Sequence, residues 1–171
     1  QVRLEFLVPS RGLIGYSTEF MTQTRGYGMM THSFDSYQPM VQGSVGGRRQ
    51  GVLVSQESGK ATQYGIIQLE DRGTIFIEPG TEVYAGMIVG EHNRENDLTV
   101  NVVKTKQLTN MRSATKDQTV TMKKARKMSL EQTLEYLNDD EYCEVTPTSI
   151  RLRKKILNKS EREKMQRRKR Q

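Results

Sequence analysis

The chain has 171 residues, of which 34 % are hydrophobic and none is tryptophan, so it can build one modest domain or two small ones. It contains no run of about 18 apolar residues, which excludes a membrane-spanning helix from the sequence. Its single cysteine, Cys143, excludes an internal disulfide and indicates a reducing, cytoplasmic compartment.

The first part of the sequence has the pattern of a β-α-β unit. Apolar residues alternate over 3–8, which predicts a strand, and a second strand is predicted over 29–37. Between them we expect a helix over 11–24, capped by Ser10 and closed by Gly26 in the left-handed conformation. A crossover of this length allows the two strands to be parallel.

A glycine-rich linker over 43–50 separates this unit from a second domain over 51–171. From Gly51 the runs "GVLVS", "ATQYGIIQL", "GTIFIEPG" and "TEVYAGMIVGEH" are rich in β-forming residues, and turn residues punctuate them. "LTVNVV", over 98–103, adds another strand. Short strands at this spacing predict a small, mostly β domain, such as a barrel or a sandwich.

A long basic loop over 104–127 interrupts the β domain, and loops of that length are usually functional or disordered. Ser129 then begins a short helix with a capping box completed by Gln132. We expect Leu130, Leu134 and Leu137 to form its buried stripe. A last strand follows over 149–157, and the basic segment over 158–171 is expected to be a frayed helix or an irregular tail.

Charge is segregated along the chain. Residues 1–99 carry a net charge of −3, residues 103–128 a net charge of +7, residues 129–150 a net charge of −6 and residues 151–171 a net charge of +9. Two basic arms thus flank an acidic patch, and polyanions are the partners that suit such arms. The acids Asp139, Asp140 and Glu141 are better explained as a solvated helix terminus or as partners for the basic arms than as a cation site.

The motifs for catalysis are incomplete. In "VSQESGKA", over 54–61, Val54 stands where a phosphate-binding loop needs glycine, and Ala61 stands where it needs the hydroxyl that binds Mg²⁺. "NKSE", over 158–161, resembles a guanine-reading motif but lies in the polar tail. His32 and His92 lack the spacing of metal ligands. We therefore expect no catalytic residue, no metal site and no cofactor in this chain.

The basic loop is the strongest candidate for a functional site. It is rich in side chains that donate to phosphate and 2′-hydroxyl groups, and only one acid offsets its charge. A passive, solvated surface remains the alternative for any charge run. The candidate RNA-binding residues of the loop are Lys104, Lys106, Gln107, Asn110, Arg112, Lys116, Lys123, Lys124, Arg126 and Lys127. A secondary set comprises Arg151, Arg153, Lys154 and Lys155.

Three stretches resemble the C-terminal part of the BipA/TypA translational GTPases: "RLEFLVPSRGLIGYSTEFMTQTRGYGMM", "HNRENDLTVNVVKTKQLTNMR" and "EVTPTSIRLRKK". The first also resembles the second half of domain V of elongation factor G. The resemblance implies an α+β chain: residues 1–42 form half of a ferredoxin-like domain V, and residues 51–171 form the family-specific C-terminal domain. The first half of domain V is missing, so we expect the helix of the β-α-β unit to be poorly covered.

The resemblance also implies a function. The intact protein would carry an N-terminal domain that binds GTP and Mg²⁺ and hydrolyses GTP, and that domain is absent here. The C-terminal domain would enter the ribosomal A site, where its basic loop contacts A-site tRNA and large-subunit rRNA. Family roles lie in ribosome assembly and in translation under stress, which implies a cytoplasmic protein.

Two other functions fit the charge pattern. The arms could dock on acidic ribosomal proteins without reading RNA, and crosslinking would separate this alternative from RNA contact. A polybasic membrane-surface binder is disfavoured, because the arms have no amphipathic apolar stripe. We therefore expect a monomer that binds the ribosome and binds neither membrane nor DNA.

Overall fold

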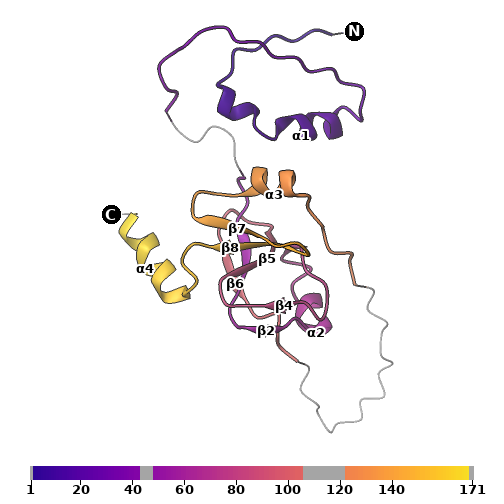
Figure 1. The fold of residues 1–171 in the computed structure, drawn as a ribbon, viewed down its shortest axis with the longest axis vertical. Coiled ribbons are helices and arrows are strands. Elements are labelled where there is room, and N and C mark those ends of the chain that lie inside the picture. Colours follow the sequence, from indigo (N-terminus) through magenta and orange to yellow (C-terminus); the bar gives the residue numbers. More distant parts are fainter. Residues whose placement is uncertain (1, 43–47, 106–121, 170–171) are drawn as a thin grey trace.

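The structure is a computed structural model that describes residues 2–42, 48–105 and 122–169. A smaller N-terminal part holds η1 and α1, and a larger part holds the strands (Figure 1). In chain order the elements are η1 (Ser10–Leu13, a 3-10 helix), α1 (Tyr16–Gln23), β1 (Val52–Ser55), β2 (Gly59–Lys60), α2 (Gln63–Ile67), β3 (Gly73–Ile75), β4 (Glu82–Val83), β5 (Met87–His92), β6 (Leu98–Val100), α3 (Leu130–Tyr136), β7 (Glu141–Val145), β8 (Ile150–Lys154) and α4 (Lys159–Lys169).

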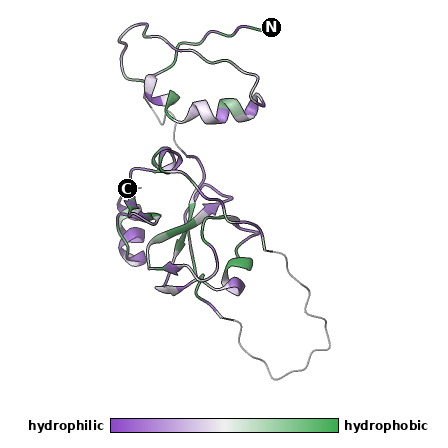
Figure 2. Ribbon diagram, turned by 45° about the vertical axis from the view of Figure 1, so that its right-hand side comes forward, coloured by the Kyte–Doolittle hydropathy of each residue, from purple (hydrophilic) through white to green (hydrophobic). Residues whose placement is uncertain are grey.

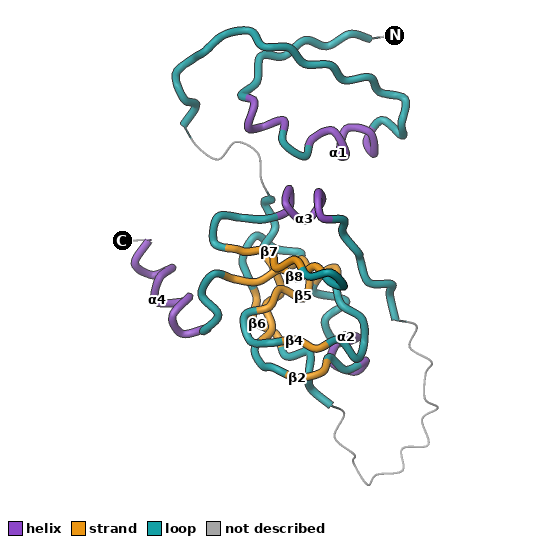
Figure 3. The backbone as a smooth tube through the Cα atoms, viewed as in Figure 1, coloured by secondary structure: helices purple, strands orange, loops and turns teal. Residues whose placement is uncertain are grey.

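A six-stranded sheet organises the larger part of the molecule (Figure 3). Its strands lie in the order β6-β1-β5-β8-β7, and β3 also pairs with β5. β1 and β6 are parallel, whereas the other pairs are antiparallel. β2 and β4 form a separate two-stranded ladder. Within the described part of the chain, β7 therefore forms one edge of the large sheet.

Apolar side chains pack against both faces of this sheet. Along β5, Met87 and Val89 belong to a first core cluster with Leu53 of β1, while Ile88 belongs to a second cluster with Leu152 of β8. This alternation follows from the period of two in a strand. Figure 2 shows the hydrophobic residues concentrated on the strands, whereas α4 is mainly hydrophilic.

The helix predicted over 11–24 is confirmed in part. The chain forms η1 and then α1, and Gly15 separates the two with a left-handed φ of 77°. Ser10 does not cap the helix, because it lies inside η1, where no side-chain hydrogen bond caps the turn. The predicted end is confirmed: Gly26 has a φ of 80°, and its N–H donates to the Met21 carbonyl at 2.7 Å.

The two strands predicted to flank this helix are wrong. Residues 3–8 and 29–37 form no strand pair within the described residues (Figure 1). Their apolar side chains are exposed, with Phe6 77 % and Met29 90 % accessible, and α1 buries no residue. A strand persists when a neighbour satisfies its backbone and its apolar face is covered. The described part of the chain supplies neither; only the poor cover of the helix was expected from the resemblance.

The mostly β character of the second domain is confirmed, with strands in four of its five predicted runs. The run "ATQYGIIQL" is the exception, since it forms α2 instead. The Thr62 hydroxyl caps this helix by accepting from the Gly65 N–H at 3.0 Å. A β-carbon at Gly65 would lie 2.5 Å from the Val102 carbonyl oxygen, so glycine allows the helix to pack closely on the chain. The isoleucines of this run favoured a strand, whereas the Thr62 cap stabilises a helix.

The helix α3 begins as predicted but buries a different face. The capping box between Ser129 and Gln132 is confirmed in both directions. The predicted leucine stripe is wrong for Leu130 and Leu134, which are 42 % and 56 % exposed, whereas Leu137 packs against the second core cluster as predicted. Thr133 and Tyr136 are the buried residues of α3. The Thr133 hydroxyl donates to the Ser129 carbonyl at 2.8 Å, so a polar side chain is accommodated at the core.

The end of the chain contains one strand that was not predicted, β7, and one helix, α4, where a frayed helix or an irregular tail was expected. β7 was missed because its sequence, "EYCEV", has few apolar residues. α4 begins after Asn158, whose side-chain oxygen accepts from the Ser160 N–H at 2.9 Å. No helix in the described ranges is long and apolar enough to span a membrane.

Candidate nucleic-acid interface

The basic loop is anchored at both ends beside α2. At its start, the Thr62 hydroxyl donates to the Lys104 carbonyl at 2.5 Å. At its end, the Lys123 N–H donates to a Glu70 carboxylate oxygen at 2.8 Å. Lys104, Lys123 and Lys124 are all exposed. The structure therefore places three of the predicted cations on the surface near one short helix.

Half of the predicted loop residues cannot be placed in this way. The candidates that lie outside the described residues are Lys106, Gln107, Asn110, Arg112 and Lys116. Their assignment as RNA-binding residues stays a prediction from the sequence.

Arg126 and Lys127 lie where the chain returns to the sheet. The Arg126 N–H donates to the Ile75 carbonyl at 2.8 Å, which fixes the backbone here. Lys127 Nζ lies 2.9 Å from Glu78, and Arg126 lies 3.8 Å from Glu91. The side chains of Arg126 and Lys127 are 50 % and 73 % exposed, and exposed ion pairs are weak. Both cations can therefore exchange these partners for a phosphate.

A groove of about 590 Å³ joins the two predicted basic regions. It lies between the tip of the β7–β8 hairpin, over 146–149, and the segment 126–128. Phe76 and Ile88 contribute apolar lining, and Arg151 borders the same groove as the cations of segment 126–128, although the strand register turns its side chain toward the Glu144 side of the sheet. Apolar surface beside cations suits the base and the phosphate of an unpaired nucleotide, respectively.

Lys154 must be removed from the secondary set of RNA-binding residues. Its side chain is 2 % exposed, and its Nζ lies 2.6 Å from Asp97, 2.9 Å from Asp140 and 2.8 Å from Glu141. Burial alone would lower the pKa of Lys154, but hydrogen bonds to Asp97 and Glu141 raise it above its ordinary value. The ammonium group is therefore a structural cation that RNA cannot reach.

Arg48, which the sequence analysis placed in the linker, completes this buried cluster. Its guanidinium donates to both Glu141 carboxylate oxygens, at 3.1 and 2.7 Å, and to the Tyr136 carbonyl at 3.2 Å. It also lies 4.4 Å from the centre of the Tyr136 ring. Asp140 and Glu141 thus pair with Lys154 of the second basic arm, which was one of the two explanations that the sequence left open, whereas the pairing of Glu141 with Arg48 was not predicted.

Arg153 and Lys155 lie beside two residues that the sequence analysis missed, Tyr142 and Glu144. Glu144 accepts from the Tyr84 hydroxyl at 2.6 Å and from Arg153 Nε at 2.5 Å. These hydrogen bonds, the first above all, lower the pKa of the Glu144 carboxyl. The sequence contained a signal for this group, because residues 142, 144, 151, 153 and 155 occupy alternate positions along two strands. The signal was not recognised because β7 was not predicted.

The histidines and the cysteine have ordinary structural surroundings. His92 is buried, and its Nδ1 lies 2.6 Å from the Asn96 carbonyl oxygen. Cys143 is partly buried, which raises the pKa of its thiol. Across residues 2–42, 48–105 and 122–169, no three His, Cys, Asp or Glu side chains gather in an arrangement that could hold a metal ion.

Comparison with known proteins agrees with these two parts of the chain. Residues 50–159 match the model of the TypA/BipA C-terminal domain, and residues 1–45 match that of the elongation factor G C-terminus. The chain is 78 % identical over 164 residues to the large ribosomal subunit assembly factor BipA of Bacillus subtilis, covering 96 % of this chain. It is 50 % identical over 162 residues to the protein of the same name from Salmonella typhimurium, covering 95 % of this chain. In both comparisons the chain spans 27 % of the relative's length.

Proposed function

The chain belongs to the TypA/BipA family, and from this membership we propose that it is the ribosome-contacting C-terminal region of a translational GTPase. The relatives named above are large ribosomal subunit assembly factors, which supports a role in assembly of that subunit. In this proposal the GTP- and Mg²⁺-binding domain lies in another part of the protein. The protein acts as a monomer in the cytoplasm, in ribosome assembly and in translation under stress.

The proposed contact is between the basic loop over 104–127 and the RNA of the A site, namely A-site tRNA and large-subunit rRNA. One observation carries this proposal: three cations of the loop, Lys104, Lys123 and Lys124, are exposed beside backbone anchors near α2. Fixed backbone anchors reduce the conformational entropy lost on binding, so the charges can contact phosphates at lower cost. The groove beside Arg126 and Lys127 provides a second contact for the same RNA.

Salt dependence tests the proposal. Each cation that contacts a phosphate releases condensed counterions, so the affinity falls with salt in proportion to the number of contacts. A triple variant, Lys104→Ala with Lys123→Ala and Lys124→Ala, should bind large ribosomal subunits and tRNA more weakly. Its plot of log affinity against log salt should be shallower by about 2 than that of the unchanged chain.

The matched control removes three exposed arginines elsewhere, Arg3, Arg25 and Arg94, by substitution with alanine. This control has the same net charge as the triple variant but should keep the original slope. Equal slopes for the two variants would refute a localised contact and leave the loop as one part of a general positive surface. Crosslinks to ribosomal proteins alone, without RNA, would favour the docking alternative.

A further inference from the structure

One face of the β7–β8 hairpin carries polar and charged side chains instead of core residues. Cys143 and Leu152 point to the second core cluster, and the residues that alternate with them lie on the opposite face of the sheet. On that opposite face β7 contributes Tyr142 and Glu144. β8 and the residue after it contribute Arg151, Arg153 and Lys155. The outer end of this face is therefore polar, cationic and aromatic.

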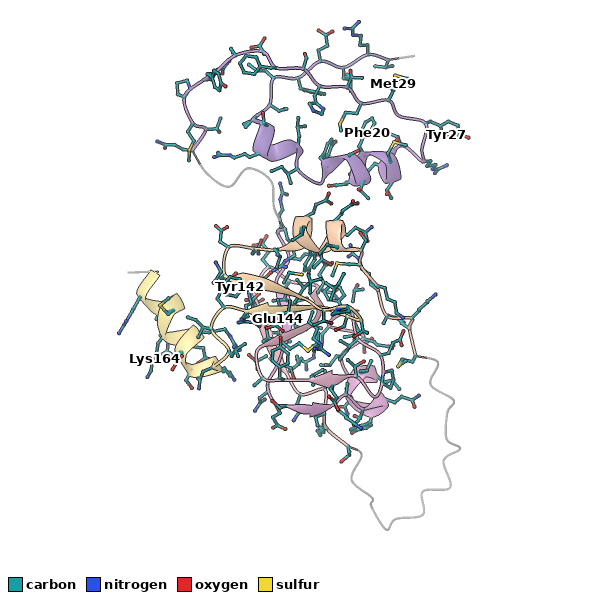
Figure 4. The ribbon with its side chains drawn as sticks, in the orientation of Figure 1. Phe20, Tyr27, Met29, Tyr142, Glu144 and Lys164 are labelled. Carbon is teal, nitrogen blue, oxygen red and sulfur yellow. The ribbon has the colours of Figure 1, made fainter. Side chains whose placement is uncertain are left out.

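Tyr142 is the aromatic centre of this face. Its side chain is 48 % exposed (Figure 4). The Arg153 guanidinium carbon lies 5.1 Å from the centre of its ring, and Lys155 Nζ lies 4.9 Å from the same point. Both distances fall within cation–π range. Both cations come from the β8 side of Tyr142, and in the described residues β7 is the edge strand, so the other side of the ring has no neighbouring strand.

Glu144 holds one of these cations in place. One carboxylate oxygen accepts from Arg153 Nε at 2.5 Å, and the other accepts from the Tyr84 hydroxyl at 2.6 Å. The Arg153 guanidinium also donates to the Lys154 carbonyl at 3.2 Å. Arg153 is therefore preorganised beside the ring of Tyr142. The three cations of this face exceed its single carboxylate, so the local charge is positive.

We propose that Tyr142 is a stacking platform for one unpaired base of single-stranded RNA, with Arg153 and Lys155 beside the phosphates that flank this base. Stacking needs an exposed π-face, and binding of the flanking backbone needs fixed cations next to it. An acidic peptide would use the cations but not the ring. The inference rests on the proposed function only in taking RNA as the partner, since it uses no residue of the basic loop.

Two synthetic oligomers of equal charge distinguish base stacking from phosphate binding. One is a fluorescently labelled RNA of ten nucleotides, and the other is a strand of ten sugar-phosphates without bases. The affinity of the 171-residue chain for each is measured by fluorescence anisotropy at one salt concentration. The chain should prefer the RNA, and Tyr142→Ala should reduce its affinity for the RNA by about fivefold or more while leaving the abasic strand unaffected.

Three further variants make the test specific. Tyr142→Trp should keep or increase the preference for bases, because the larger ring stacks at least as well. Lys155→Gln should lower the affinity for the RNA and for the abasic strand equally, because it removes a phosphate contact. Tyr27→Ala is the control, since Tyr27 is 93 % exposed but has no cation within cation–π range in the described structure. Thermal melts verify that each variant is folded.

The outcomes distinguish the inference from the proposed function. Equal affinity for both strands, unchanged by Tyr142→Ala, would overturn the stacking platform and leave RNA binding through the loop intact. Absence of binding to either strand and to large ribosomal subunits would overturn both. Binding of polyglutamate as tight as that of the RNA would overturn the stacking platform in favour of an acidic protein partner.

Discussion

At the scale of single residues, the buried guanidinium of Arg48 has the largest expected effect on stability. Its side chain is 6 % exposed, and that of its partner Glu141 is fully buried. Arg48→Ala would leave the Glu141 carboxylate with Lys154 as its nearest cation and without two of its hydrogen bonds. Breaking a buried pair from one side costs about 3–5 kcal/mol. Because Lys154 remains, we expect the free energy of unfolding to fall by about 3 kcal/mol, measured by urea denaturation.

Arg49→Ala is the matched control for this variant. Arg49 is the next residue and is exposed, so its removal should leave the urea midpoint almost unchanged. Similar losses in the two variants would contradict the buried cluster as the source of stability. Arg48→Lys should recover only part of the loss, since an ammonium group cannot donate to both Glu141 oxygens in the geometry of a guanidinium.

At the scale of elements, α3 depends on its cap more than on its leucines. The Ser129 hydroxyl accepts from the Gln132 N–H at 3.2 Å, and the Gln132 side chain accepts from the Ser129 N–H at 3.0 Å. Ser129→Ala removes the first of these bonds and leaves the second intact. We expect the free energy of unfolding to fall by about 1 kcal/mol, measured by urea denaturation.

The control for the cap is Leu134→Gln, on the same helix. Leu134 is 56 % exposed, so a polar side chain there should change the urea midpoint very little. A larger loss for Leu134→Gln than for Ser129→Ala would mean that the leucine stripe predicted from the sequence is buried after all. The two variants therefore decide between the observed and the predicted buried face.

At the scale of the whole molecule, stability should reside in the larger part alone. Every buried apolar side chain of the described residues lies between Val52 and Leu152, and residues 2–42 contribute none. Gly15 approaches the Glu135 side chain of α3, but this contact buries no apolar side chain. A shortened chain of residues 48–171 should therefore unfold at the same denaturant midpoint as the full chain, followed by circular dichroism.

A second shortened chain, of residues 50–171, lacks Arg48 and tests how much that residue stabilises the larger part. It retains the core clusters but lacks the guanidinium that pairs with Glu141. Its midpoint should fall as far as that of Arg48→Ala. A lower midpoint for 48–171 than for the full chain would show that residues 1–47 stabilise the sheet.

The parts of this structure that could be predicted depend on local signals. Runs of β-forming residues between turns located β1 and β5, alternation located β8, and the Ser129–Gln132 spacing located the start of α3. α2 was missed because two isoleucines favour a strand, whereas its helix is set by the Thr62 cap and by close packing at Gly65. β7 was missed because an edge strand need not be apolar.

The candidate site, too, could be predicted from the sequence only in part. The sequence located the basic segments, because charge is visible in composition, and Lys104, Lys123, Lys124, Arg126 and Lys127 are indeed exposed. The sequence could not distinguish the buried Lys154 from its exposed neighbours, because all of them belong to one run of cations. Burial depends on strand register, and the pairing of β8 with β5 and β7 decides which side chains point inward.

By itself, the sequence determined the family of this protein, the mostly β character of its larger part and the positions of its basic segments. The family follows from the resemblance of three long stretches, and the other two follow from composition and periodicity, which are properties of residues close together in the chain. The tertiary structure alone decided that Arg48 and Lys154 are structural, that Tyr142 lies beside two cations, and that segment 126–128 and Arg151 line one groove. Each of these contacts joins residues that are distant in sequence or depends on strand register, and only the packing of the sheet brings them together.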